Sequence, residues 1–142
     1  MDIKKVFVVG AGFMGSGIVE NVAVKGLAVT AYDISQNQLD KSIAGIRKNL
    51  EKSVSKGKLS EDEKEAAIGR ISCTTDISQC AEADAIIEAV AENKDIKVSI
   101  MKELEKYAKD DAIIASNTSS ISITALGNIF KNPARFVGMH FF

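Results

Sequence analysis

A glycine-rich run near the N-terminus has the spacing of a phosphate-binding turn. The run from Gly10 to Gly15 reads GAGFMG, with Gly12 as its second glycine. In such a turn the first glycine permits a tight bend, the second lets the backbone approach a diphosphate, and the third lets a helix pack closely on a strand. A plain turn can carry the same residues, so the pattern alone is weak evidence.

An acidic residue lies where a nucleotide-binding turn of this kind needs one. The glycine turn follows a strand-like run and opens a helix-like run, whose N-terminal N–H groups would favour phosphates. Asp33 lies 18 residues after Gly15, at the end of the next strand-like run. A carboxylate there can accept hydrogen bonds from a ribose 2′-hydroxyl and would repel a 2′-phosphate. The turn and Asp33 together predict a site for NAD rather than NADP, and disfavour a plain turn with a solvated aspartate.

Three further polar sites follow strand-like runs. Glu92, a serine-rich segment that contains Ser119, and His140 each come just after such a run. Ligands of open α/β sheets sit beyond the carboxyl ends of the strands, so we expect these sites to converge there. Each has a plainer explanation, as a helix start, a helix cap or a buried core histidine. Convergence favours hydride transfer to NAD, with a neutral imidazole taking the proton of a substrate hydroxyl that the serine holds.

Strand-like and helix-like segments alternate along the chain, which indicates a parallel sheet with helices on both faces. We expect an α/β fold, a Rossmann-type doubly wound parallel sheet with a long helical pair inserted after the second strand. Strands are expected at residues 3–9, 28–32, 71–74, 85–90, 112–115 and 136–139.

Two pairs of residues mark the starts of the inserted helices. Ser35 with Gln38, and Ser60 with Glu63, have the spacing of capping boxes. The helix after Ser35 should span about 20 residues and about 30 Å. This is longer than a sheet-covering helix needs, so part of it should project beyond the sheet.

The composition is that of one ordinary globular domain. The chain has 142 residues, 46% hydrophobic and 26% charged, with a net charge of -1, which gives no electrostatic reason to expect nucleic acid or a membrane as partner. No apolar run reaches the roughly 20 residues of a membrane span. Cys73 and Cys80 are too few for a disulfide framework and lack metal-like spacing, so no metal is expected. By default we expect the cytoplasm.

Four stretches of the chain resemble a known family. They read VGAGFMGSGI (9–18), IIEAVAEN (86–93), ASNTSSISI (115–123) and RFVGMHFF (135–142). They are similar to the L-3-hydroxyacyl-CoA dehydrogenases, especially the bacterial 3-hydroxybutyryl-CoA dehydrogenases. The resemblance implies an NAD(H)-dependent oxidoreductase that interconverts (S)-3-hydroxyacyl-CoA and 3-oxoacyl-CoA, with short acyl chains favoured.

The resemblance also implies roles for single residues. Ser119 matches the active-site serine near the substrate oxygen and the nicotinamide, and His140 matches the catalytic base. Glu92 and Lys97 match residues near the nicotinamide end of the cofactor. The implied cofactor-binding set is Gly10, Gly12, Phe13, Met14, Gly15, Asp33, Glu92, Lys97 and Ser119.

In the family the inserted helical pair helps to hold coenzyme A. Asn49 and Lys56 fall at contact positions there, although some relatives have serine in place of Asn49, and Ser119 also belongs to the substrate site. Independently, residues 47–58 carry five basic side chains against Glu51. That charge suits a phosphorylated carrier and equally suits a solvated basic helix.

The family extends past the segments seen here. Residues 1–142 correspond to its NAD-binding domain, whereas the glutamate that orients the histidine, the helical C-terminal domain and most of the dimer interface lie beyond. We therefore expect a truncated cofactor-binding half with little activity of its own, and a homo-oligomer for the full-length enzyme. Two alternatives stay open: a nucleotide-binding module without catalysis, and another β-hydroxyacid dehydrogenase, which the serine-rich and His-Phe-Phe segments disfavour.

Overall fold

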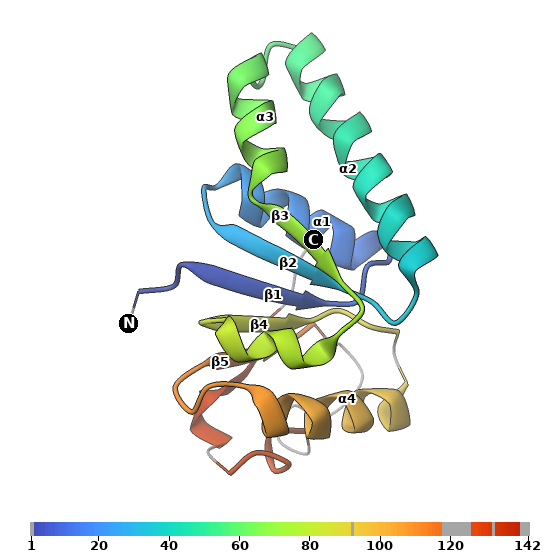
Figure 1. Cartoon of the computed structure of the whole chain (residues 1–142). Helices are drawn as coiled ribbons and strands as arrows, with labels where there is room; N and C mark the ends of the chain where they lie inside the picture. Colours follow the sequence, from blue (N-terminus) through green and yellow to red (C-terminus); the bar gives the residue numbers. More distant parts are fainter. Residues whose placement is uncertain (1, 92, 118–125, 132, 140–142) are drawn as a thin grey trace.

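The computed structural model describes residues 2–91, 93–117, 126–131 and 133–139. All six strands form one sheet, in the order β3-β2-β1-β4-β5-β6, and every pairing is parallel (Figure 1). This is the strand order of a dinucleotide-binding Rossmann sheet, and the expected fold is confirmed. The strands are β1 (Lys5–Val9), β2 (Ala28–Tyr32), β3 (Ile71–Thr74), β4 (Ala85–Glu88), β5 (Ile113–Ser116) and β6 (Phe136–Gly138).

Helices cover both faces of the sheet because its strands are apolar on both sides. Val8 of β1 packs in one buried cluster with Ile18 and Leu39, whereas the preceding residue, Phe7, packs in a second cluster with Met101. Successive side chains of a strand point to opposite faces, so one strand serves both cores. The helices are α1 (Phe13–Val24), α2 (Gln36–Ser55), α3 (Glu61–Gly69) and α4 (Lys94–Tyr107), with short 3-10 helices η1 (Ile77–Glu82) and η2 (Pro133–Arg135).

The bounds of four strands differ from the expected ones. β1 begins at Lys5 rather than at residue 3, and β6 ends at Gly138 rather than at residue 139. At β4 and β5 buried polar side chains cause the difference. β4 ends at Glu88 rather than at residue 90, since the N–H of Val90 donates to the Glu88 carboxylate at 2.7 Å instead of continuing the ladder. β5 lies one residue later than expected and includes Ser116, which pairs with Glu88 in the sheet register. A polar residue extends this strand because its hydroxyl has a buried partner, described below.

The two expected capping boxes have different outcomes. The box of Ser60 and Glu63 is confirmed, with both of its hydrogen bonds present. At Ser35 the hydroxyl does accept from the N–H of Gln38, but the Ser35 N–H donates to the Asp33 carboxylate at 2.9 Å. The second half of that box is therefore wrong, because Asp33 is the acceptor at hand. The side chain of Gln38 instead donates to the carbonyl oxygen of Ala11 at 3.0 Å.

The long helix predicted after Ser35 is confirmed as α2, which is 20 residues long. Its buried side chains are Leu39, Ser42, Ile46 and Leu50, a spacing that places one stripe of the helix against the core. Beyond this stripe α2 and α3 extend together past the sheet (Figure 1). Within the described ranges, no helix combines the length and the apolar character needed to span a membrane.

The glycine loop (residues 10–15) brings α1 unusually close to β1. Gly10 has a φ of +104°, which favours glycine, and a Cβ there would lie 2.8 Å from the Ala89 carbonyl oxygen. A Cβ on Gly15 would lie 1.7 Å from the Gly10 carbonyl oxygen, so only glycine fits. A Cβ on Gly17, two residues further along α1, would meet nothing within 4 Å.

One carboxylate, that of Asp84, holds together the N-terminal ends of two neighbouring strands. Asp84 accepts the N–H groups of Lys4 and Lys5 at 2.9 and 3.0 Å and the ammonium group of Lys109 at 2.7 Å. These bonds hold the pKa of Asp84 well below its usual range. The bond from Lys109 contributes most, and the two backbone amides contribute less. The same residue thus connects the beginnings of β1 and β4 with the segment after α4.

We expect Gly15→Ala to destabilise the domain and Gly17→Ala to leave it unchanged or slightly more stable. The first substitution forces α1 away from β1 at a cost of about 1–3 kcal/mol or more. The second removes a helix-interior glycine, a gain of up to about 1 kcal/mol. Urea unfolding of the two variants measures both values, and equal free energies of unfolding would contradict the close-packing argument.

We expect Asp84→Asn to lower the melting temperature at pH 7, and the difference from wild type to narrow in acid. Because the pKa is lower in the folded chain than in the unfolded chain, this stabilisation is complete above the unfolded value of about 4 and is lost as the pH falls below it. Thermal unfolding from pH 7 to pH 3 tests this, with Asp110→Asn as a control at an exposed aspartate. A pH-independent difference would contradict it.

Candidate functional site

The glycine loop offers backbone N–H groups at the N-terminal end of α1. The N-cap residue is Gly12, which has no side chain to cap the helix, and the first turn of α1 contains no acidic residue. A Cβ on Gly12 would meet nothing within 4 Å, and Phe13 is 97% exposed, so the space in front of these amides is open. A helix N-terminus attracts anions, and this geometry fits the diphosphate of a dinucleotide.

Asp33 lies at the end of β2, directly beside the glycine loop. One of its carboxylate oxygens accepts the N–H of Ala11 at 3.0 Å, and the other accepts the N–H of Ser35 at 2.9 Å. Each carboxylate oxygen can accept more than one hydrogen bond, so both can still bind a hydroxyl group. Two backbone amides therefore hold the carboxylate at the position where a ribose is expected.

A cavity of about 540 Å³ continues from Gly10 and Asp33 toward α4. The cavity is mainly apolar, with Ile34, Val90 and Ile96 among its walls, as suits the flat ring of a nucleobase. Tyr32 also borders it, and burial, together with the charge of Asp33, raises the pKa of that phenol. We call this cavity the base pocket.

Sequence reasoning missed the walls of the base pocket. A signal was present at Ile34, which directly follows Asp33 in a connecting segment and is 87% exposed. A large apolar side chain in such a place suggests a ligand surface more than a core. The walls contributed by α4 carried no comparable signal, because Ile96 and Ile100 have ordinary helical spacing.

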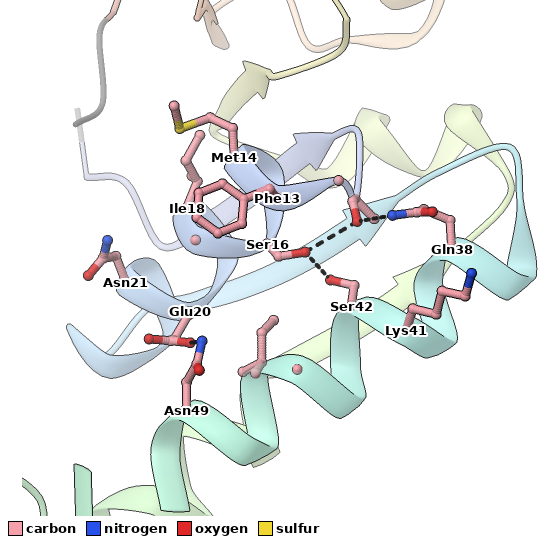
Figure 2. Close-up of a pocket in the computed structure, with 15 residues that line it drawn as sticks. Phe13, Met14, Ser16, Ile18, Glu20, Asn21, Gln38, Lys41, Ser42 and Asn49 are labelled. Carbon is pink, nitrogen blue, oxygen red and sulfur yellow. Dashed lines mark hydrogen bonds between the residues drawn. The ribbon is translucent and has the colours of Figure 1, made fainter. Parts of the chain in front are cut away.

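A second cavity, of about 510 Å³, lies between α1 and α2 (Figure 2). Met14 and Phe13 line it from the glycine-loop side, and Asn49 lines it further along α2, where its amide donates to Glu20 at 3.1 Å. The structure thus brings Asn49 to the same cavity as three of the expected cofactor residues, Gly12, Phe13 and Met14. Lys56 is the C-cap of α2 and is not among the residues that line this cavity.

Three hydrogen bonds tie this cavity to the glycine loop. The carbonyl oxygen of Ala11 accepts from Gln38 at 3.0 Å and from the hydroxyl of Ser16 at 3.2 Å. The Ser16 hydroxyl also lies 2.6 Å from that of Ser42 on α2 (Figure 2). Because the N–H of Ala11 is held by Asp33, both sides of this residue's backbone are fixed by β2 and α2.

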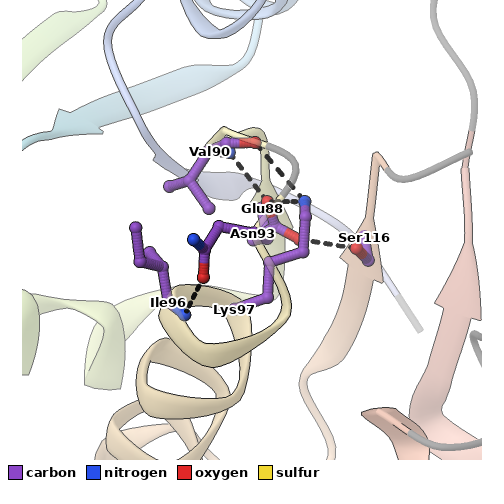
Figure 3. A network of polar contacts seen from close by, with 6 residues as sticks. All are labelled: Glu88, Val90, Asn93, Ile96, Lys97 and Ser116. Carbon is purple, nitrogen blue, oxygen red and sulfur yellow. Dashed lines mark hydrogen bonds and ion pairs between the residues drawn. The ribbon is translucent and has the colours of Figure 1, made fainter. Parts of the chain in front are cut away.

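A buried polar cluster lies beneath the carboxyl edge of the sheet (Figure 3). It consists of Glu88, Lys97 and Ser116, each 0% exposed. One Glu88 oxygen accepts from the Lys97 ammonium group at 2.6 Å, and the other accepts from the Ser116 hydroxyl at 2.5 Å. Removing one partner of a buried ion pair typically costs about 3–5 kcal/mol, because the other charge stays buried.

The buried polar cluster changes how Lys97 is understood. Lys97 was expected near the nicotinamide end of the cofactor, and that role stays a prediction. The structure places its ammonium group inside the fold against Glu88, with the Val90 carbonyl oxygen 3.4 Å away. Sequence reasoning missed Glu88 and Ser116. The available signal was an acidic residue within an otherwise apolar strand, which is rare unless the charge has a partner.

The three segments that carry Glu92, Ser119 and His140 leave the sheet at one edge. The N–H of Asn117 donates to the Glu88 carbonyl oxygen at 2.8 Å, and the N–H of Met139 donates to the Ser116 carbonyl oxygen at 3.0 Å. Glu92, Ser119 and His140 themselves lie outside the described residues. Their roles therefore stay predictions.

Two solved structures that resemble this chain over nearly its whole length are 3-hydroxybutyryl-CoA dehydrogenases. The (S)-3-hydroxybutyryl-CoA dehydrogenase of Ralstonia eutropha matches 99% of the chain with a TM-score of 0.96 and 43% identity, over 50% of its own length. The 3-hydroxybutyryl-CoA dehydrogenase of Escherichia coli matches 100% of the chain with a TM-score of 0.97 and 39% identity, over 30% of its own length.

A curated relative from Psychrobacter cryohalolentis, the fatty acid oxidation complex subunit alpha, is 45% identical over 99% of the chain and 20% of its own length. The chain therefore spans half or less of the length of these relatives. The family model described as "3-hydroxyacyl-CoA dehydrogenase, NAD binding domain" matches residues 5–142, which include the glycine loop, Asp33 and the base pocket. On this match, the chain belongs to the family of NAD-binding domains of 3-hydroxyacyl-CoA dehydrogenases.

Proposed function

We propose that this chain is the cofactor-binding part of an NAD(H)-dependent enzyme that interconverts (S)-3-hydroxyacyl-CoA and 3-oxoacyl-CoA. The observation that carries the proposal is the continuous path from the base pocket past Asp33 to the glycine loop, along the carboxyl edge of the sheet. The relatives named 3-hydroxybutyryl-CoA dehydrogenase support short acyl chains, such as 3-hydroxybutyryl-CoA and acetoacetyl-CoA.

The described residues bind the diphosphate, the ribose and the adenine ring of the dinucleotide in different ways. The amides of the glycine loop and the dipole of α1 stabilise the diphosphate, and Asp33 accepts from the ribose hydroxyls. The base pocket excludes water from the adenine ring, for which its apolar walls are suited. Bound NAD supplies the nicotinamide carbon that accepts or returns a hydride.

The proposed chemistry at the substrate rests on two residues beyond β5 and β6. His140, in its neutral form, accepts the hydroxyl proton when the substrate is oxidised and returns it when the substrate is reduced. Ser119 holds the substrate oxygen against the imidazole, which keeps the proton path short. Glu92 and Lys97 serve the nicotinamide end, and for Lys97 the buried ion pair with Glu88 supports a role through neighbouring residues.

The substrate carrier is proposed to lie along α2. Asn49 lines the cavity between α1 and α2, and Lys56 at the end of α2 adds positive charge within the basic stretch 47–58. Such a surface suits the phosphates of coenzyme A. We further propose that the complete enzyme is a homo-oligomer, as the family resemblance implies. The cytoplasm stays the default proposal for its compartment.

We expect Asp33→Asn to weaken NADH binding and to narrow the preference for NADH over NADPH. Loss of a charge-assisted hydrogen bond lowers the affinity for NADH about tenfold or more. Loss of the negative charge removes the repulsion of a 2′-phosphate, so binding of NADPH suffers less. Fluorescence titration of both cofactors measures the ratio, with Asp40→Asn on the exposed side of α2 as a control. An unchanged ratio would argue against Asp33 as the ribose ligand.

We expect His140→Ala to abolish turnover while NADH affinity stays close to that of the wild type. Loss of a general base slows the reaction about 100-fold to 10,000-fold. Acetoacetyl-CoA reduction by a complete enzyme that contains this chain gives the rate, and NADH fluorescence gives the affinity. Lys102→Ala, at an exposed position of α4, is the control. Parallel loss of binding and turnover would remove the catalytic role, and a wild type that binds NADH without turnover would favour a nucleotide-binding module.

A further inference from the structure

We propose that Glu88 and Ser116 are positioning residues. They set the geometry of the sheet edge where hydride transfer is proposed. This inference rests on the proposed function. It starts from the observation that the buried polar cluster contacts every one of the three strand ends beyond which Glu92, Ser119 and His140 are found in the sequence. Neither residue touches the cofactor or substrate in this proposal; each acts through the segments that it holds.

The Glu88 carboxylate has a single satisfied arrangement. One oxygen accepts from the Ser116 hydroxyl at 2.5 Å, and the other accepts from both the Val90 N–H at 2.7 Å and the Lys97 ammonium group at 2.6 Å. The Glu88 and Lys97 side chains are both 0% exposed, so water cannot replace a lost partner. A buried network of this kind is costly unless all its members are bonded, which makes the geometry unique.

Each bond of the cluster reaches a different segment of the edge. Val90 lies two residues before Glu92, in the connection from β4 to α4. The hydroxyl of Ser116 binds Glu88, and its carbonyl oxygen accepts from the N–H of Met139, the residue that precedes His140. Ser116 is therefore the shared contact between the β4 end and the β6 end, and the chain continues from it through Asn117 toward Ser119.

The segment that follows Glu88 also packs against the glycine loop. The connection after β4 lies against Gly10, where a Cβ would meet the Ala89 carbonyl oxygen at 2.8 Å and a side-chain carbon of Val90 at 3.2 Å. The N–H of Ala89 donates to the Val9 carbonyl oxygen at 2.8 Å, which joins this connection to the end of β1. One carboxylate thus relates the diphosphate loop to the edge where hydride transfer is proposed.

Stability alone is a poor explanation for this cluster. A buried ion pair contributes little net stability compared with apolar residues of the same volume, because desolvation offsets the attraction. The surrounding positions of β4 and β5, such as Ile86 and Ile114, are apolar and fully buried. A polar set at the carboxyl ends of the same strands, where ligands of this fold bind, is therefore better explained by geometry.

Ser116→Ala tests the proposal, with His140 as the reporter because it is the single histidine of the chain. In the wild type, NADH should shift the NMR signal of the labelled His140 imidazole. In Ser116→Ala this shift should be lost, while the Kd for NADH by fluorescence stays within about threefold, since the glycine-loop amides are untouched. Ser116→Thr, which keeps the hydroxyl, should restore the shift.

Ile114→Val on the same strand is the matched control, because it loosens β5 without removing a polar contact. The proposal is overturned if Ser116→Ala keeps the wild-type imidazole shift, or if Ile114→Val loses it to the same extent. Failure of the proposed function looks different, since the wild-type imidazole would then not respond to bound NADH at all.

Discussion

The close approach of α1 to β1 is the constraint on which the cofactor-binding edge of the sheet depends. Two glycines, Gly10 and Gly15, make that approach possible. Gly15 lies directly over the Gly10 carbonyl oxygen, and any side chain at that point would push the helix away. Once the helix is that close, its first amides face the open space at Gly12, and Ala11 comes within reach of Asp33 on one side and of Gln38 and Ser16 on the other. The loop that faces a diphosphate is thus held by its neighbours rather than by its own side chains.

A second polar arrangement, at β4 and β5, works under opposite physical conditions. The contacts around Ala11 are partly exposed, and water can take the place of a lost bond there. The contacts of Glu88 with Lys97 and Ser116 are fully buried, and a lost bond there leaves an unsatisfied charge. On the proposed function, the nucleotide side of the edge can therefore adjust when a ligand arrives, whereas the side proposed to face the substrate is held by buried bonds. That division suits a site that binds a cofactor reversibly and needs one fixed geometry for hydride transfer.

Patterns of single residues predicted the fold well because they depend on local physics. Alternating strands and helices show in the periodicity of apolar residues, the glycine turn shows in its spacing, and Asp33 is found by its distance from that turn. Contacts made across the sheet were not predictable in the same way. The side chain of Gln38 was expected to cap its own helix, yet it reaches Ala11. Lys97 was expected near the nicotinamide end of the cofactor, and no local pattern predicted its ion pair with Glu88. In both cases a partner more distant in the chain than any local pattern extends determined the outcome.

The strand order also has a consequence for how the chain acquires its structure. β1 lies between β2, which follows soon after it in the chain, and β4, which comes much later. Asp84, the residue just before β4, accepts from the Lys5 N–H across 79 positions. During synthesis on the ribosome one side of β1 can pair early, whereas its other side has no partner until β4 has emerged. Late pairing of this kind slows folding and leaves an apolar strand edge open to other chains. For that interval β1, in which four of five residues are buried in the finished domain, has an unpaired edge that can bind another chain.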